Sequence, residues 1–322
     1  MKAKTKQICK KIFVWAFYLL VLVFIVLYFK DIDWGAIRNV EIAWGYMAIS
    51  FLVRMAGLLL QPLAWNMQLK PYGSTLPGKK LYSIYAQSWI GRYIPGKVAW
   101  VGGKIYFATQ EGVDKNVAII TSFLDSMLQV IGSLLVAAVF FLVVQRAPGV
   151  DDSLIYLTYA LTAALLLCLV PRVFNFLVNL VHKVLKHSAI DEKYHMTGGP
   201  MLGSTAIVVG AKILSGMAVA IIALSVFGEV SFADFLYVVA ANCAATAIGM
   251  AAIFAPAGLG VKESLQVVLL GAVFPREVVL VVVTLASLQS ILGDLVFYAV
   301  ARLTLGFGKK KKPEEQAEEQ GN

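Results

Sequence analysis

The stretch GRYIPGKVAWVGGK, at residues 91–104, decides how the rest of the chain is interpreted. Pro95 lacks a backbone N–H, and its ring clashes with the preceding turn of a helix. Gly96, Gly102 and Gly103 allow backbone conformations that other residues resist, and they let another group approach closely. These residues predict a structural break between two short helical segments.

The break is cationic, since it contains Arg92, Lys97 and Lys104, and the chain around it is apolar. Of the 322 residues, 59% are hydrophobic and 15% are charged, whereas a soluble domain carries roughly 25% charged residues. Several apolar runs reach the ~20 residues that a helix needs to cross a bilayer. The chain is therefore predicted to be a membrane protein, in which these cations need an anionic partner, a wet cavity or the membrane surface.

Six full crossings are predicted, and they make the chain an all-α, polytopic helical bundle. They are expected at residues 12–29, 43–65, 117–144, 154–180, 206–227 and 277–305. The first is longer than the core of a signal peptide and no cleavage pattern follows it, so it is expected to be retained. Residues 1–11 form a basic N-terminal segment, residues 12–305 the membrane domain, and residues 306–322 a charged tail that is expected to be disordered.

Two broken units lie between these crossings. The first broken unit spans residues 81–108 around the opening stretch, and neither half is long enough to cross comfortably. It predicts a re-entrant hairpin. The second spans residues 235–274 around the sequence APAGLGVKE at 255–263, with Pro256, Gly258 and Gly260 as its break. An alternative treats residues 235–254 and 264–274 as two ordinary crossings, which gives eight helices.

The distribution of Lys and Arg sets the orientation. With each broken unit returning to its own side, one side of the membrane holds sixteen Lys and Arg outside the first broken unit and the other holds four. Because cytoplasmic loops are rich in Lys and Arg, both termini are expected in the cytoplasm, with the chain in the cell membrane. The two broken units then enter from opposite sides, which predicts an inverted repeat of the kind found in transporters.

The net charge of +9 does not indicate nucleic acid, because the basic residues cluster beside apolar segments. That placement indicates contact with anionic lipid headgroups. Cys9, Cys168 and Cys243 have no spacing typical of a metal site or a disulfide. No metal and no cofactor are therefore expected.

The motifs RYIPGK at 92–97 and PAGLGVKE at 256–263 resemble those of the lysylphosphatidylglycerol synthase transmembrane-region family. The resemblance covers about residues 10–305. It implies a flippase-like integral membrane protein, found in this family either alone or fused to a cytoplasmic aminoacyl-transferase domain. Family members usually carry a Glu-Arg pair just before the acidic residue of the following helix. Here the sequence TSFLD at 121–125 keeps only Asp125.

The same resemblance limits the expected activity. Aminoacyl transfer in the fused members belongs to the soluble domain, which needs a few hundred further residues, and this chain stops seventeen residues after Leu305. Phosphatidylglycerol lysyltransferase activity is therefore not expected. The resemblance implies lipid translocation or an accessory role.

Charged residues at the breaks are the first candidates for a site, since each costs about 2.5–3.5 kcal/mol to insert at the centre of a membrane helix. Arg92 and Lys97 are predicted to hold a lipid phosphate at the helix ends, or else to reach the headgroups of the cytoplasmic leaflet. Lys262 and Glu263 are predicted to form the outer half of the site.

Charged residues inside the crossings are the second group. Arg54, Asp125, Lys212 and Asp294 either belong to the site or form two ion pairs between helices. The tryptophans Trp65, Trp89 and Trp100 are predicted to lie at the membrane interface.

The sequence thus predicts a flippase or transporter for a phosphate-bearing lipid: a phospholipid, an aminoacyl-phospholipid or a polyprenyl phosphate. The alternative is an accessory subunit that presents a lipid-linked substrate to a separate glycosyl- or aminoacyl-transferase. An enzyme is least favoured, because the chain has no Ser-His-Asp, HExxH or P-loop pattern.

Overall fold

The structure, a computed structural model, describes residues 40–94, 98–144, 152–186, 191–252 and 255–305. The expected crossing at 12–29, both terminal segments, and Pro95, Gly96 and Lys97 lie outside the described residues. Throughout the described ranges the regular elements are α-helices and short 3-10 helices, with no strand. The prediction of an all-α bundle is confirmed.

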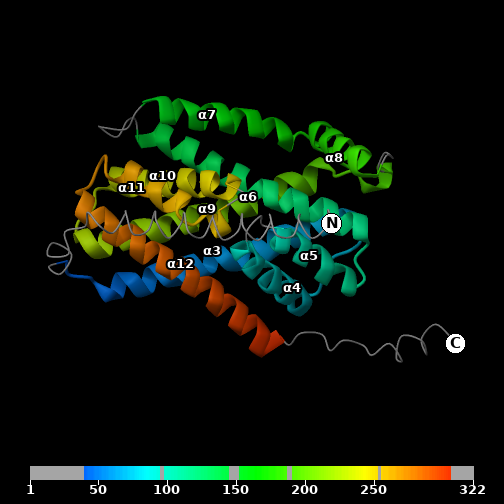
Figure 1. Cartoon of the computed structure of the whole chain (residues 1–322), viewed down its shortest axis with the longest axis horizontal. Helices are drawn as coiled ribbons and strands as arrows, with labels where there is room; N and C mark the ends of the chain where they lie inside the picture. The colour runs from blue at the N-terminus through cyan, green and yellow to red at the C-terminus, as the bar shows by residue number, and fades with distance from the viewer. Residues whose placement is uncertain (1–39, 95–97, 145–151, 187–190, 253–254, 306–322) are drawn as a thin grey trace, which may run out of the picture.

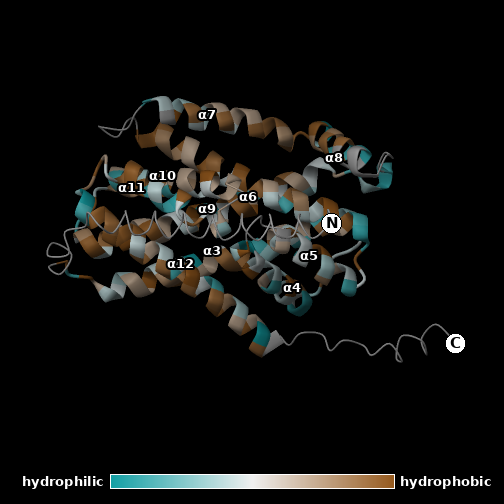
Figure 2. Cartoon of the chain, viewed as in Figure 1, coloured by the Kyte–Doolittle hydropathy of each residue, from teal (hydrophilic) through white to brown (hydrophobic). Residues whose placement is uncertain are grey.

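Five helices in the described part of the chain are long and apolar enough to cross a membrane. A helix of 20 residues rises about 30 Å, the thickness of the hydrocarbon core. Figure 2 shows that these helices are mostly hydrophobic along their length, with hydrophilic residues gathered toward the two ends of the bundle. The chain is a multi-pass membrane protein. The five helices are α3 (Trp44–Leu69), α6 (Lys115–Val144), α9 (Gly198–Phe227), α10 (Phe232–Ala251) and α12 (Arg276–Leu305).

The first broken unit consists of α4 (Gly78–Ile90), the 3-10 turn η2 (Gly91–Tyr93) and α5 (Val98–Gln110). Its two helices have 13 residues each, so each rises only about 20 Å. They pack against one another. In Figure 1 they lie side by side near the end of the bundle where α3 ends and α6 begins.

The second broken unit consists of α10, the 3-10 turn η5 (Pro256–Gly258) and α11 (Val261–Leu270). The ten residues of α11 rise about 15 Å, too short for an ordinary crossing, whereas the 20 residues of α10 are long enough to cross. Helix length therefore matches neither two ordinary crossings nor a hairpin of two short helices. Turns η2 and η5 contact each other, so the two breaks meet.

The crossing predicted at residues 154–180 is not one continuous helix. The chain forms α7 (Asp152–Leu166), the turn η3 (Leu167–Leu169) and α8 (Pro171–Lys186), and it bends by 84° between η3 and α8. Pro171 explains the bend, because proline disfavours helical geometry in the residue before it and has no N–H to continue the helix. Val170 accordingly has an extended backbone.

The long helices pack closely at glycines. A Cβ added at Gly57 of α3 would lie 3.0 Å from the carbonyl oxygen of Ala211 in α9, so only a small residue fits at this crossing point. The two broken units and the helices that follow them make corresponding contacts. Helix α6 packs on α10, and α12 packs on α4. Within each set, α5 packs on α6 and α11 packs on α12.

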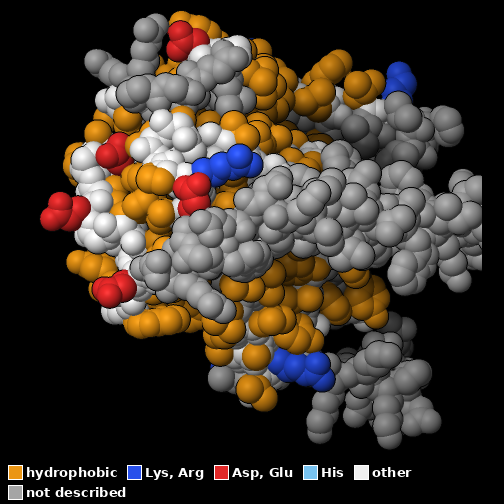
Figure 3. Space-filling model, turned by 60° about the vertical axis from the view of Figure 1, so that its left-hand side comes forward, with side chains coloured by type: hydrophobic (Ala, Val, Ile, Leu, Met, Phe, Trp, Pro, Cys, Tyr) orange, Lys and Arg blue, Asp and Glu red, His pale blue; other side chains and the backbone are white. Residues whose placement is uncertain are grey.

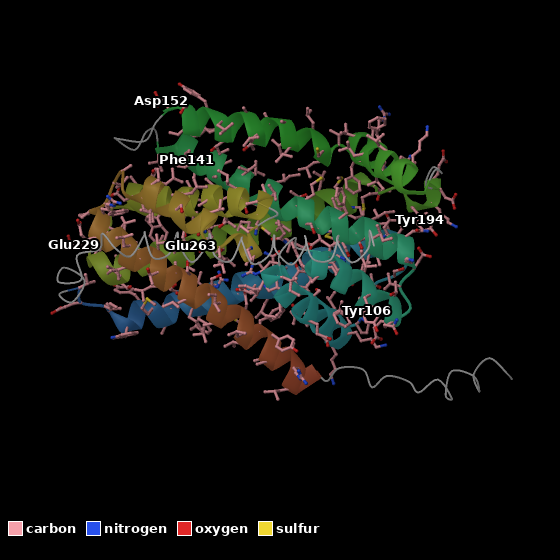
Figure 4. The ribbon with its side chains drawn as sticks, viewed as in Figure 1. Tyr106, Phe141, Asp152, Tyr194, Glu229 and Glu263 are labelled. Atoms are coloured by element: carbon pink, nitrogen blue, oxygen red, sulfur yellow. The ribbon has the colours of Figure 1, made fainter. Side chains whose placement is uncertain are left out.

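The two ends of the bundle differ in charge. The lysine-rich end carries the exposed residues Lys70, Lys79, Lys80, Lys115, Lys183 and Lys193, together with the exposed acids Asp114, Asp191 and Glu192. The acidic end carries the exposed residues Glu41, Asp152, Glu229 and Glu277, together with Arg276. Figure 3 brings this second end forward and shows acidic side chains scattered over it. In Figure 4, Glu229 and Asp152 mark the acidic end, and Tyr106 and Tyr194 lie toward the other.

Candidate functional site

A cavity of about 80 Å³ lies where the two breaks meet the long helices. One water needs roughly 10–15 Å³ of such space, so several waters or a small polar group fit inside. Helices α3, α9 and α12 and both broken units contribute to its wall. The charged residues of its wall, in the ranges that the structure describes, are Arg54, Arg92, Lys212, Lys262 and Glu263.

Arg92 enters the cavity from η2 and forms an ion pair with Asp294 in the middle of α12. Two further donors hold the same carboxylate: Trp89 through its indole N–H at 3.0 Å and Tyr93 through its hydroxyl at 2.6 Å. The Arg92 guanidinium also lies 4.5 Å from the centre of the Trp89 ring, a cation–π distance. The tip of the first broken unit is thereby fixed against α12.

Arg54 approaches Asp294 from α3, on another side. Its Nη2 lies 3.5 Å from Oδ1 of Asp294. The same nitrogen donates to the hydroxyl of Ser290 at 2.7 Å and to the carbonyl of Ser290 at 3.2 Å. Gly293 leaves room for this arginine, since a Cβ there would lie 3.2 Å from Arg54 Nε. A single buried carboxylate is therefore shared by two arginines.

Lys212 and Lys262 have a different environment. Both line the cavity, Lys212 from α9 and Lys262 from the first turn of α11. Lys212 is only 6% exposed. Neither ammonium group has a hydrogen bond or an ion pair with the described part of the chain. Both lysines therefore line the cavity without a direct partner among the described residues.

Glu263 stabilises the second break. Its Oε2 accepts a hydrogen bond from the backbone N–H of Gly260 at 2.7 Å, and its Oε1 accepts one from the hydroxyl of Ser287 at 2.8 Å. The break itself requires glycine, since φ is +79° at Gly258 and +84° at Gly260. Glu263 is thus both a lining residue and the cap of α11.

A second charged cluster, the Lys104 cluster, lies in the core beside the cavity. Lys104 of α5 forms an ion pair with Asp125 of α6, and Tyr85 donates to the same carboxylate at 3.2 Å. The Lys104 ammonium lies 4.3 Å from the centre of the Tyr85 ring and 5.3–5.4 Å from those of Trp65 and Trp100. None of these five residues lines the cavity.

Several predicted positions differ from the structure. Gly102 and Gly103, assigned to the first break, lie inside α5, and a Cβ at either position would meet at most ordinary contacts. Trp65, Trp89 and Trp100 are buried and not at the membrane interface, because their rings surround Lys104 and Arg92.

The four charges predicted inside the crossings also separate. Arg54 and Lys212 line the cavity. Asp294 does not line it but contacts the two arginines that do, Arg54 and Arg92. Asp125 pairs instead with Lys104, which the sequence reasoning did not assign to any partner. The sequence did contain a signal for this pair: Lys104 lies in a short apolar segment, and the crossing that follows it contains Asp125.

Comparison with models of known protein families gives a match. The family described as the lysylphosphatidylglycerol synthase TM region matches residues 13–297. This range includes every residue that lines the cavity and both breaks. No curated protein is similar enough to this chain to match it.

Proposed function

Because the chain belongs to the lysylphosphatidylglycerol synthase transmembrane-region family, we propose that it moves a phosphate-bearing lipid between the two leaflets. Membership places it among membrane proteins of lipid metabolism or transport. The headgroup would occupy the charged cavity while the acyl chains stay in the bilayer. The cavity suits the binding of an anionic headgroup. Four of its charged residues are cations, and the fifth, Glu263, already accepts a hydrogen bond as the cap of α11.

The observation that carries the proposal is the excess of positive charge in the cavity wall. Among the described residues, four basic and one acidic residue line it, a net charge of +3, and the contact of Asp294 with two of them reduces this to +2. Such charges inside a membrane protein cost about 2.5–3.5 kcal/mol each unless they are compensated. A phosphate in the cavity supplies that compensation, and charge-assisted hydrogen bonds to phosphate are strong.

The arrangement of the broken units supports access from both leaflets. Helices α4 and α5 approach the cavity from the lysine-rich end, and α10 and α11 from the acidic end. Together with the reciprocal helix contacts, this arrangement leads us to interpret the two broken units as members of an inverted repeat. Transporter sites lie where such repeats meet.

The orientation follows from the charges at the two ends. We place the lysine-rich end in the cytoplasm of a cell membrane, because Lys and Arg are enriched in cytoplasmic loops. Helix α12 ends on that side. The first broken unit then contributes Arg92 from the cytoplasmic leaflet, and the second contributes Lys262 from the outer leaflet.

The test is lipid exchange in liposomes that contain the purified chain. The movement of fluorescent phosphate-bearing lipids between leaflets is followed by adding dithionite, which quenches only the fluorophores in the outer leaflet. Lys262→Gln removes a cavity charge, and Lys193→Gln is the matched control because Lys193 is exposed at the lysine-rich end. We expect exchange by the wild type and by the control, and a loss of most of it in Lys262→Gln.

Two outcomes contradict the proposal. Equal exchange by Lys262→Gln and the control would remove the cavity from the transport path. No exchange of any phosphate-bearing lipid by folded wild-type protein would favour the accessory role, in which the chain holds a lipid-linked substrate for a separate transferase. Co-purification with such an enzyme is the corresponding positive result.

A further inference from the structure

We infer that the cavity selects a headgroup with two negative charges, a phosphate monoester or a diphosphate, over the singly charged phosphodiester of common phospholipids. The inference rests on the proposed function only in placing a lipid headgroup in the cavity. It adds the chemical class of that headgroup, and it predicts that headgroups carrying an amine are disfavoured.

The first argument is the balance of fixed charges. Asp294 compensates one of its two arginine partners, and Glu263 compensates one further cation of the wall. Two positive charges then remain. A phosphodiester offers one negative charge, whereas a phosphate monoester carries about −1.5 to −2 at neutral pH. A dianion therefore neutralises the cavity and a monoanion leaves a buried cation.

The second argument is that two of the four cations lack a direct partner. Lys212 is 94% buried, since it is 6% exposed, and Lys262 projects from the first turn of α11. Both line the cavity, and neither has a hydrogen bond or a salt bridge in the part of the chain that the structure describes. Burying an ammonium without a partner is costly. Both lysines therefore point to a ligand that supplies negative charge.

The third argument is the number of donors. The two arginines each have a buried Nε–H without an acceptor among the described residues. The lysines add ammonium donors from two other helices. A phosphate monoester presents three free acceptor oxygens, one more than a phosphodiester. The donors come from four elements, α3, η2, α9 and α11, so they can reach oxygens on several sides of one phosphate group.

The acidic lining residue is unsuited to receive a cationic headgroup. Both carboxylate oxygens of Glu263 already accept hydrogen bonds, from the Gly260 N–H and from the Ser287 hydroxyl. An amine in the cavity would instead meet four basic side chains. Like charges at short range in a low dielectric repel strongly. A lysyl-modified lipid is therefore expected to bind worst.

The test measures binding apart from transport. The purified full chain in uncharged detergent is titrated with three short-chain lipids: dihexanoyl phosphatidic acid, dihexanoyl phosphatidylglycerol and the lysyl ester of the latter. We expect phosphatidic acid to bind about tenfold more tightly than phosphatidylglycerol, the size of one charge-assisted contact. In Lys212→Gln and in Lys262→Gln the preference is expected to fall below about threefold, and in Lys193→Gln to remain.

Inorganic phosphate, added as a competitor, distinguishes headgroup recognition from binding of the acyl chains. It should displace phosphatidic acid from the wild type, and a bound lipid that phosphate does not displace would overturn the inference. Equal affinity for the three lipids, or tighter binding of the lysyl ester, would also overturn it, even where liposome exchange is observed. A dianion preference without any exchange would keep this inference and contradict the transport proposal.

Discussion

Arg92 and Asp294, which lie 202 positions apart in the sequence, form an ion pair that joins the tip of the first broken unit to the middle of α12. Asp294 is fully buried. Because it also contacts Arg54 of α3, one carboxylate connects three elements that surround the cavity. The cavity wall on this side is held by that carboxylate.

Replacing Asp294 by asparagine is expected to destabilise the protein severely. The change keeps the shape of the side chain but leaves two largely buried arginines without their counter-ion, which costs about 3–5 kcal/mol. Thermal unfolding in detergent measures it. Asp191→Asn is the control, since Asp191 is exposed and forms a salt bridge with the exposed Lys193, a kind of pair worth about 0–1 kcal/mol. Equal unfolding temperatures for the two variants would contradict the central role of Asp294.

The Lys104 cluster is expected to support stability rather than lipid selection. Lys104→Met or Asp125→Asn alone leaves a buried charge and should cost about 3–5 kcal/mol, while the double variant should cost clearly less than the sum. A double-mutant cycle on unfolding in detergent measures the coupling. Additive losses would show that the two residues do not act as a pair. The lipid preference of the folded double variant should match that of the wild type, because neither residue lines the cavity.

Gly258→Ala is expected to disrupt the second break. Gly258 and Gly228 have nearly the same positive φ, +79° and +76°, but a Cβ at Gly258 would lie 2.7 Å from the carbonyl oxygen of Gly249, whereas a Cβ at Gly228 meets nothing within 4 Å. Both alanine variants pay the backbone strain. Only Gly258→Ala adds the clash, about 1–3 kcal/mol. Unfolding measurements on the two variants isolate this difference, and equal losses would contradict the close contact.

The orientation is tested by thiol labelling. In a background with Cys9, Cys168 and Cys243 replaced by alanine, a single cysteine at Glu229 should react with an impermeant maleimide on intact cells. A single cysteine at Lys193 should react only after the membrane is permeabilised. The reverse pattern would invert the assignment of the lysine-rich end to the cytoplasm.

The fold was predictable where the signal is local. Long apolar runs located α3, α6, α9 and α12 to within several residues, because the need to span ~30 Å of hydrocarbon dominates. The bend between α7 and α8 was missed although Pro171 lies inside the predicted crossing at 154–180. The apolar composition outweighed the local effect of proline on the helix.

The site was predictable in its members but not in its pairings. Arg54, Arg92, Lys212, Lys262 and Glu263 were all named from the cost of charge in a membrane, and all five line the cavity. That Asp294 binds two arginines while Asp125 binds Lys104 depends on contacts between helices far apart in the sequence. Composition and spacing carry no information on such contacts.

The most direct test of the central claim is to locate the bound headgroup. A phosphatidic acid analogue with a photoreactive group beside the phosphate is crosslinked to the full chain in liposomes, and the modified peptides are identified by mass spectrometry. The account predicts crosslinks in η2, α9 and the first turn of α11, lost when inorganic phosphate is added in excess. Crosslinks confined to the exposed lysines of the lysine-rich end would contradict it.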